Sequence, residues 1–329
     1  MSQSPIRIAV VGAGVFGRNH LRVIRETPAA ELAGVYDADA QRGAAAASEF
    51  GCRAFHSLEE VAAGAQAAIV AVPTVSHCEV GVRLMDAGLD VLVEKPIAVN
   101  VEEAHALMAQ AARRGRVLQA GHLERFNPAV EVARSLITVP LFFEIHRLSV
   151  FSPRSLDVDV VSDLMIHDLD ILLSMTGAAP REIRAAGINV LSGKADIANV
   201  RLAFPGGCIA NLTASRVSTE RVRKLRFFQP GQYVSVDYAK QECFSISVTP
   251  QRQIVPRNWP VTRSEPLKLQ LESFLECVAT RARPRVDGAA ATQALSLAAD
   301  IQRAISEHGI EVAATLASAP PIAWDASKA

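Results

Sequence analysis

Residues 6–17 have the sequence IRIAVVGAGVFG, and this stretch decides the fold of the whole chain. The apolar run Ile6–Val11 predicts a buried strand, and the pattern G-x-G-x-x-G follows it directly before a predicted helix. Gly12 permits a tight turn, Gly14 lets the backbone approach a pyrophosphate, and Gly17 lets helix and strand pack closely. The positive end of the helix attracts the negative charge. The residues predicted to form this dinucleotide site are Gly12, Gly14, Val15, Phe16 and Gly17.

An acidic residue supports the same interpretation. Asp37 closes the second predicted strand, 20 residues beyond Gly17, where its carboxylate can accept hydrogen bonds from the adenosine ribose hydroxyls. Its charge should repel a 2′-phosphate, so NAD is favoured over NADP as the cofactor. Arg42 lies too far along the chain, on this interpretation, to reverse that preference. The alternative is a glycine turn in another kind of α/β protein.

Strand and helix signals alternate through the first part of the chain in the way that builds a parallel sheet. The apolar runs are continuous, which suits strands covered on both faces. The predicted strands are Ile6–Val11, Glu31–Tyr36, Ala67–Val72, Val91–Val93 and Val117–Gly121. We therefore expect residues 1–122 to form an NAD-binding Rossmann domain with a doubly wound parallel sheet.

Strand-like segments separated by turn signals such as Pro205-Gly206-Gly207 dominate the second part of the chain, which favours a largely antiparallel sheet. These segments are Leu141–Val150, Ile183–Leu191, Asn199–Phe204, Cys208–Ser215, Leu225–Phe228, Tyr233–Tyr238 and Phe244–Val248. Helices are predicted from about Val161 to Met175 and, later, along two apolar stripes at helical spacing. We expect residues 123–315 to form an α+β domain with an open sheet and flanking helices, followed by a poorly ordered tail over 316–329.

Composition narrows the classes of partner. The 34 basic and 34 acidic residues give a net charge of zero, so nothing indicates a nucleic-acid or acidic-lipid partner. The longest uncharged stretch, Val61–Cys78, contains proline and histidine and is not a membrane span. The five cysteines are scattered without C-x-x-C, which argues against a disulfide framework or a zinc cluster. We expect a cytoplasmic protein without a metal.

Two segments follow strands of the first sheet at their carboxyl ends, where ligands of open α/β sheets bind. Their prolines, Pro73 and Pro96, stiffen the turns. Lys95 is placed to point into the crevice between cofactor and substrate, although a solvated loop lysine is the alternative. His77 suits a helix start or a packing role better than catalysis. The residues predicted to line the cofactor here are Pro73, Thr74, His77, Glu94 and Lys95.

A second constellation lies in the predicted helix of the second domain. Spacings of four and three put Asp163, His167 and Asp170 on one helical face. Asp163 can then orient His167, and a histidine suits proton transfer near neutrality. The alternative is a helix start that carries acids to complement its dipole, with a histidine that only packs.

These motifs resemble the glucose–fructose oxidoreductase / inositol dehydrogenase / MocA (Gfo/Idh/MocA) family over nearly the whole chain. The markers are the glycine loop, Glu94-Lys95-Pro96 and the helix from Asp163 to Asp170. The resemblance implies that Lys95 and His167 form a catalytic pair helped by Asp163. It also implies a substrate-binding second domain whose open sheet joins subunits into a homo-oligomer, a dimer or tetramer. The family often has glycine where this chain has Met165.

A narrower resemblance comes from residues 121–128, GHLERFNP, and 154–161, RSLDVDVV. They are similar to the branch that oxidises the 3-hydroxyl of UDP-N-acetylglucosamine or its uronic acid. Arg125 and Arg154 could then meet the diphosphate, and Asn127 an amide or hydroxyl, alongside Lys95, His167 and Asp170. The alternatives are loop arginines and a helix cap at Asn127. Alternative functions are an NAD(P)-dependent inositol or free-sugar dehydrogenase or reductase and, in another class, a non-catalytic NAD-binding regulatory protein.

Overall fold

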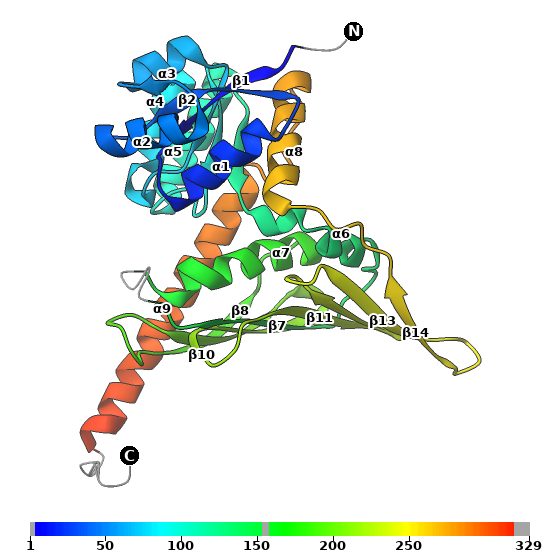
Figure 1. Ribbon diagram of the computed structural model, residues 1–329. Helices are drawn as coiled ribbons and strands as arrows, with labels where there is room; N and C mark the ends of the chain where they lie inside the picture. Colours follow the sequence, from blue (N-terminus) through cyan, green and yellow to red (C-terminus); the bar gives the residue numbers. More distant parts are fainter. Residues whose placement is uncertain (1–3, 153–157, 319–329) are drawn as a thin grey trace.

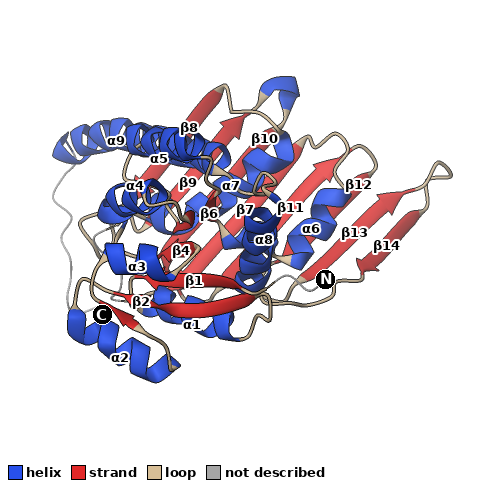
Figure 2. Cartoon of the chain, turned by 90° about the horizontal axis from the view of Figure 1, so that it is seen from above, coloured by secondary structure: helices blue, strands red, loops and turns tan. Residues whose placement is uncertain are grey.

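The computed structural model describes residues 4–152 and 158–318, which form two sheets with helices on and between them (Figures 1 and 2). The first sheet is parallel, with strand order β3-β2-β1-β4-β5-β6. Its strands are β1 (Ile6–Val11), β2 (Ala30–Tyr36), β3 (Ala54–Phe55), β4 (Ala67–Val70), β5 (Asp90–Glu94) and β6 (Leu118–Gly121). The helices along this part are α1 (Val15–Arg25), α2 (Ala40–Phe50), α3 (Leu58–Gly64), α4 (His77–Asp86) and α5 (Val101–Arg114). The doubly wound fold is thus confirmed.

Local sequence signals place several of these helices. Ser57 and Asn100 accept hydrogen bonds from the main-chain N–H groups three residues on, at 3.2 and 2.8 Å, so these side chains cap the N-termini of α3 and α5. Gly115 ends α5 in the left-handed conformation, which glycine adopts without steric cost. The reversal of strand order between β1 and β4 leaves the carboxyl ends of the strands facing one crevice, the usual ligand position in this architecture.

The second sheet has the order β14-β13-β12-β11-β7-β10-β9-β8. Its strands are β7 (Phe142–Val150), β8 (Glu182–Ile188), β9 (Ile197–Ala203), β10 (Ile209–Ser218), β11 (Val222–Gln229), β12 (Gln232–Asp237), β13 (Glu242–Val248) and β14 (Ile254–Trp259). All neighbours pair antiparallel except β7 and β10, which are parallel. The predicted open, mostly antiparallel sheet is confirmed. The edge strand β14 escaped prediction because Pro256 interrupts it.

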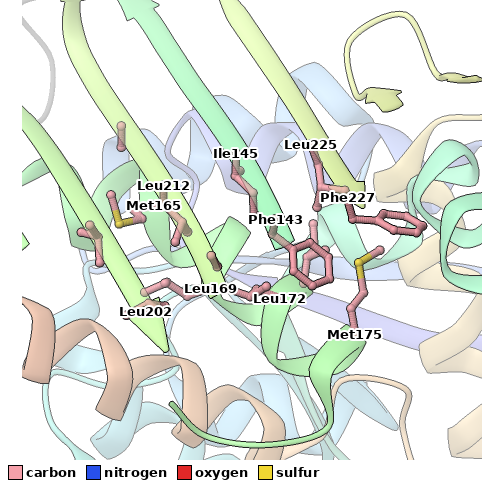
Figure 3. Packing of buried hydrophobic residues seen from close by; sticks show 14 of the residues in the cluster. Phe143, Ile145, Met165, Leu169, Leu172, Met175, Leu202, Leu212, Leu225 and Phe227 are labelled. Carbon is pink, nitrogen blue, oxygen red and sulfur yellow. The ribbon is translucent and has the colours of Figure 1, made fainter. Parts of the chain in front are cut away.

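One face of this sheet carries the core of the second layer. The helices α6 (Pro128–Ser135) and α7 (Ile166–Thr176) lie between this sheet and the first domain (Figure 1). Side chains of α7 such as Leu169 and Leu172 pack against Phe143 and Ile145 of β7 (Figure 3). All four side chains are at most 1% exposed. This packing fixes the helix on which the candidate base lies.

The last two helices connect the layers. Helix α8 (Pro266–Thr280) returns to the first sheet, where Leu271 and Phe274 are buried with Ile8 and Leu21. Helix α9 (Gly288–Ser318) contacts α5 in the first layer and α7 and β8 in the second. Helical structure therefore continues to residue 318, three residues into the predicted tail, because the alanine-rich sequence favours helix. Residues 319–329 lie outside the described residues, and the proposed domain boundaries stay a prediction.

None of the helices within residues 4–152 and 158–318 is both long enough and apolar enough to cross a membrane.

Candidate active site

The three glycines of the loop between β1 and α1 differ in what a side chain at each position would contact. Gly12 has φ +103°, and a Cβ there would collide with the main chain of Ala71. A Cβ at Gly17 would collide with the carbonyl oxygen of Gly12, so both glycines are required by the fold itself. At Gly14, the N-cap of α1, a Cβ would meet nothing within 4 Å. The helix N-terminus therefore opens on free space at the one glycine that packing does not require, which fits a pyrophosphate.

Two apolar side chains border that opening. Val15 is 65% and Phe16 is 40% exposed, both in the first turn of α1. Large exposed apolar side chains beside a polar loop are typical of a ligand site. Their position agrees with the cofactor contacts expected of them, which stay a prediction.

Asp37, just beyond β2, is already heavily hydrogen-bonded. Its Oδ2 accepts from the N–H of Ala13 at 2.7 Å, and its Oδ1 accepts from the N–H of Asp39 at 2.9 Å. Arg42 donates to both oxygens, at 3.0 and 2.9 Å. Burial raises the pKa of Asp37, but these hydrogen bonds outweigh it and leave the pKa lowered. Arg42 is nearer to Asp37 than its place in the sequence indicates, because the first turn of α2 brings it back onto that carboxylate; its expected lack of influence on the choice between NAD and NADP stays a prediction.

His77 joins the two turns that follow β4 and β5. Its Nδ1 lies 2.8 Å from the carbonyl oxygen of Pro96, and its Nε2 lies 2.9 Å from that of Val72. Burial lowers the pKa of His77. Both ring nitrogens face main-chain carbonyls and one of them donates a hydrogen bond, so the structure favours the packing alternative over a cofactor contact. Pro73 is exposed and Thr74 partly exposed on the neighbouring turn.

Glu94 at the end of β5 is bonded inward. Its Oε1 lies 2.7 Å from Nε2 of His20 on α1, and both side chains are at most 8% exposed. Its Oε2 accepts from the N–H of Lys95 at 3.2 Å. The pair ties the glycine-loop helix to the lysine turn. Sequence patterns gave no indication of His20, because the contact spans 74 residues.

Lys95 extends from the first layer to the second. Its Nζ donates to the carbonyl oxygen of Asp163 at 2.8 Å and lies 3.4 Å from the Asp163 Oδ1. Residues Val161–Met165 form a π-helical turn before α7, in which the N–H of Ile166 donates to the carbonyl of Val161. The π turn shifts Asp163 away from the position that regular α-helical spacing predicts.

The predicted hydrogen bond between Asp163 and His167 is therefore absent. Nδ1 of His167 is buried and has no partner among the described residues. Asp163 binds Lys95 instead, and the positive charge of Lys95 acts on His167. Burial, followed by the charges of Lys95 and Arg147, holds the pKa of His167 well below its usual range. A neutral imidazole beside an ammonium group is what a general base needs near neutral pH.

Three of the predicted substrate contacts are engaged within the protein. Arg125 is 8% exposed and donates to the carbonyl oxygen and Oδ1 of Asp170, at 3.3 and 3.2 Å. Asn127 caps α6 through the N–H of Ala129 and donates to the carbonyl of Tyr238. The structure thus favours the structural alternatives for Arg125 and Asn127. Asp170 keeps one buried, unpartnered oxygen, and its pKa is raised by burial. Arg154 lies outside the described residues.

A buried ionic cluster supports α7 from below. Arg147 on β7 donates to both oxygens of Asp168, at 2.7 and 2.8 Å, and to Glu124 at 3.1 Å. All three side chains are at most 7% exposed. Arg223 on β11 approaches Glu124 to 3.8 Å. Because Asp168 follows His167 directly, this cluster fixes the turn of helix that carries the candidate base.

The fold and the glycine loop define the class of protein, an NAD-binding oxidoreductase. A model described as "Oxidoreductase family, NAD-binding Rossmann fold" (GFO_IDH_MocA) matches residues 6–122, and one described as "GFO/IDH/MocA C-terminal domain" matches residues 146–229. The chain belongs to the Gfo/Idh/MocA family. The predicted family, enzyme class and NAD cofactor are confirmed.

Individual relatives support this family assignment. The chain is 36% identical over 309 residues to the UDP-N-acetylglucosamine 3-dehydrogenase of Acidithiobacillus ferrooxidans, covering 91% of this chain and 97% of that protein. The solved structure of that enzyme superposes with a TM-score of 0.88 over 93% of this chain and 99% of its own. Inositol 2-dehydrogenase 1 of Saccharopolyspora erythraea is 36% identical over 51% of this chain and 53% of its own length.

Proposed function

We propose that this enzyme oxidises the 3-hydroxyl of UDP-N-acetylglucosamine, or of its uronic acid, to a 3-keto sugar. The observation that carries this proposal is Lys95, which Asp163 holds beside the helix that bears His167. The substrate rests on the similarity to the Acidithiobacillus ferrooxidans enzyme over nearly the full length of both chains. The Saccharopolyspora erythraea inositol dehydrogenase matches over only 53% of its length, which favours the nucleotide sugar over the inositol alternative.

The chemistry follows from the surroundings of two side chains. His167 is kept neutral, so it can accept the hydroxyl proton while NAD, when bound, takes up the hydride. Lys95 is oriented by two oxygens of Asp163 and offers its third N–H group to the alkoxide that develops at the substrate oxygen. Asp163 thus helps the pair through Lys95. Positioned proton transfer of this kind contributes ~10²–10⁴-fold.

Recognition of the diphosphate is assigned to Arg154 rather than Arg125, whose guanidinium already bonds to Asp170. Asp170 contacts the substrate through Oδ2, the side-chain oxygen to which Arg125 does not bond. A cytoplasmic location suits a nucleotide-sugar substrate and the five thiols, none of which is paired.

The open face of the second sheet is the proposed subunit interface. Figure 1 shows α6 and α7 on its opposite side and α9 passing the end of the sheet at β8. Phe142, Phe228 and Tyr233 alternate along their strands with core residues and pack together, with ring centroids 5.7 and 5.0 Å apart. An aromatic cluster on an uncovered sheet face suits burial against a second copy.

The test is NADH formation, followed by absorbance, across UDP-sugars, free hexoses and inositols. We expect turnover with UDP-N-acetylglucosamine or its uronic acid, and kcat/KM at least tenfold lower with unphosphorylated sugars. If the enzyme prefers inositol or a free hexose, that compound replaces the nucleotide sugar as the proposed substrate. NAD binding without turnover on any substrate would favour a regulatory protein.

A further inference from the structure

The π turn Val161–Met165 departs from the regular helical hydrogen-bond pattern. The N–H of Ile166 donates to the carbonyl oxygen of Val161, five residues back, whereas a regular α-helix would use Ser162. Single π turns are rare and are often found at functional sites. A main-chain path of this kind persists where neighbouring groups favour it over the regular helix.

Asp159, just before the turn, binds its first N–H groups. Oδ1 of Asp159 accepts from the N–H groups of Val161 and Ser162, at 2.8 and 3.1 Å. The carbonyl oxygen of Asp159 accepts from the N–H of Asp163 at 3.1 Å. These bonds cap the N-terminus of the helical segment and fix where it begins.

Gln302 on α9 adds a support from a distant part of the chain. Its Nε2 donates to Oδ2 of Asp159 at 2.6 Å and to Oγ of Ser162 at 2.7 Å. The amide nitrogen carries two hydrogens, so both bonds form together. Helix α9 also contacts the π turn and α7. Gln302 thus joins the residue that caps the turn to the residue directly before Asp163.

This support bears on Lys95, because Lys95 binds the main chain of the turn. Its Nζ donates to the carbonyl oxygen of Asp163 at 2.8 Å, whereas the Asp163 Oδ1 lies farther away, at 3.4 Å. The position of a carbonyl oxygen follows the course of the main chain. It therefore depends on what anchors residues 159–162 more than on the Asp163 side chain. Displacing a group at the reacting centre by about 1 Å can lower a rate by ~10²-fold.

We propose that Asp159 and Gln302 are positioning residues for Lys95: the hydrogen bond between them holds the π turn so that the Asp163 carbonyl receives the lysine ammonium. The inference rests on the proposed role of Lys95. Both residues act through the main chain of the turn and not on the substrate.

The test reverses the polarity of this hydrogen bond. Asp159→Asn keeps an oxygen for the two N–H groups of the turn but sets its NH₂ group against that of Gln302. Gln302→Glu sets one carboxylate against another. The double variant Asp159→Asn/Gln302→Glu restores the bond with donor and acceptor exchanged. The matched control is Gln293→Glu, at an exposed position of the same helix.

Each variant is measured for kcat and KM, for NAD affinity by fluorescence titration and for melting temperature, with Lys95 present and in Lys95→Met. We expect each single variant to lower kcat at least tenfold with NAD affinity unchanged, and the double variant to recover to within about threefold of the parent enzyme. In Lys95→Met the same substitutions should change kcat less than about twofold, because no lysine is left to position. Gln293→Glu should have no effect in either case.

Parent kcat in both single variants, or equal losses with and without Lys95, would overturn the inference. If Gln302→Glu does not fold, the same criteria apply to Gln302→Met, which removes both bonds without adding a charge.

The pH midpoint of kcat/KM adds a readout that a loss of stability alone would not move. Burial and nearby positive groups lower the pKa of His167, and acids pair with two of these groups. The positive groups are Lys95 after β5, Arg147 on β7, His122 after β6 and Arg223 on β11, and the paired acids are Asp163 and Asp168. Asp159→Asn removes a negative charge, which by itself would lower that pKa. We expect the midpoint to rise instead, because a displaced Lys95 lowers the pKa less; a midpoint that falls or stays the same would contradict the inference.

Lys95→Met separates the inference from the function on which it rests. If Lys95→Met keeps full kcat, the proposed function fails. If Lys95→Met is slow while Asp159→Asn and Gln302→Glu turn over like the parent enzyme, only the inference fails.

Discussion

Lys95 donates a hydrogen bond to the main-chain carbonyl oxygen of Asp163 at 2.8 Å, and this bond joins the two layers of the molecule. The acceptor lies in a π-helical turn, a feature often found at functional sites. The bond places an ammonium group from the first sheet beside the helix that carries His167. The Lys95 side chain is only 18% exposed, so solvent screens the charge of Lys95 weakly.

Replacing either member of the pair should remove most of the turnover. We expect His167→Ala and Lys95→Met each to lower kcat by ~10²–10⁴-fold, because each removes a group that acts on the transferring proton. The double variant should lose less than the product of the two factors, since the residues act as a unit. NAD affinity, measured by fluorescence, should be unchanged in His167→Ala, and exposed Lys194→Met serves as the control. Near-normal turnover by His167→Ala would leave that histidine a packing residue.

The pH dependence should follow His167. A base must be unprotonated, and the pKa of His167 is held below its ordinary value by burial and by Lys95. kcat/KM should therefore be level around pH 7 and fall only on the acid side, below the ordinary histidine value of ~6.5. Lys95→Met removes the positive charge that helps lower the pKa, so its residual activity should fall at a higher pH. A pH midpoint unaltered by Lys95→Met would show that the two groups do not interact.

The glycine loop allows a test that separates fold from ligand. Gly14→Ala introduces a methyl group into open space, so melting temperature should stay within a few degrees while NAD binds at least tenfold more weakly. Gly17→Ala should destabilise the protein itself, because its methyl group collides with Gly12. The control is Gly309→Ala, which faces open space on α9. If calorimetry shows that Gly14→Ala binds NAD with unchanged affinity, the pyrophosphate binds elsewhere.

Cofactor choice should depend on the pair Asp37 and Arg42. Asp37→Ser removes the charge that repels a 2′-phosphate and frees the guanidinium of Arg42 to bind one. We expect NADP to bind at least tenfold more tightly to this variant and NAD more weakly. Arg42→Ala should instead sharpen the preference for NAD. If the double variant Asp37→Ser/Arg42→Ala binds NADP as well as Asp37→Ser does, Arg42 has no part in the selection.

Sequence patterns predicted the features of the fold that depend on residues close together in the chain. The strand, glycine loop and Asp37 follow from short-range rules, and the sheets follow from apolar runs and turns. The relation of Asp163 to His167 could not be predicted, because the spacing argument assumes a regular α-helix and one π turn breaks it. The role of Arg147 depends on its contacts with Asp168 and Glu124, which lie in distant segments and which sequence order does not reveal.

The central claim is that hydride leaves C3 of the sugar while His167 removes the 3-hydroxyl proton. The direct measurement uses UDP-N-acetylglucosamine deuterated at C3, with the reduced cofactor analysed by mass spectrometry. We predict one deuterium in the NADH formed by the parent enzyme, a slower single-turnover rate than with the unlabelled sugar, and no NADH above background from His167→Ala. Reduced cofactor without deuterium, or labelled NADH formed at the parent rate by His167→Ala, would contradict this account.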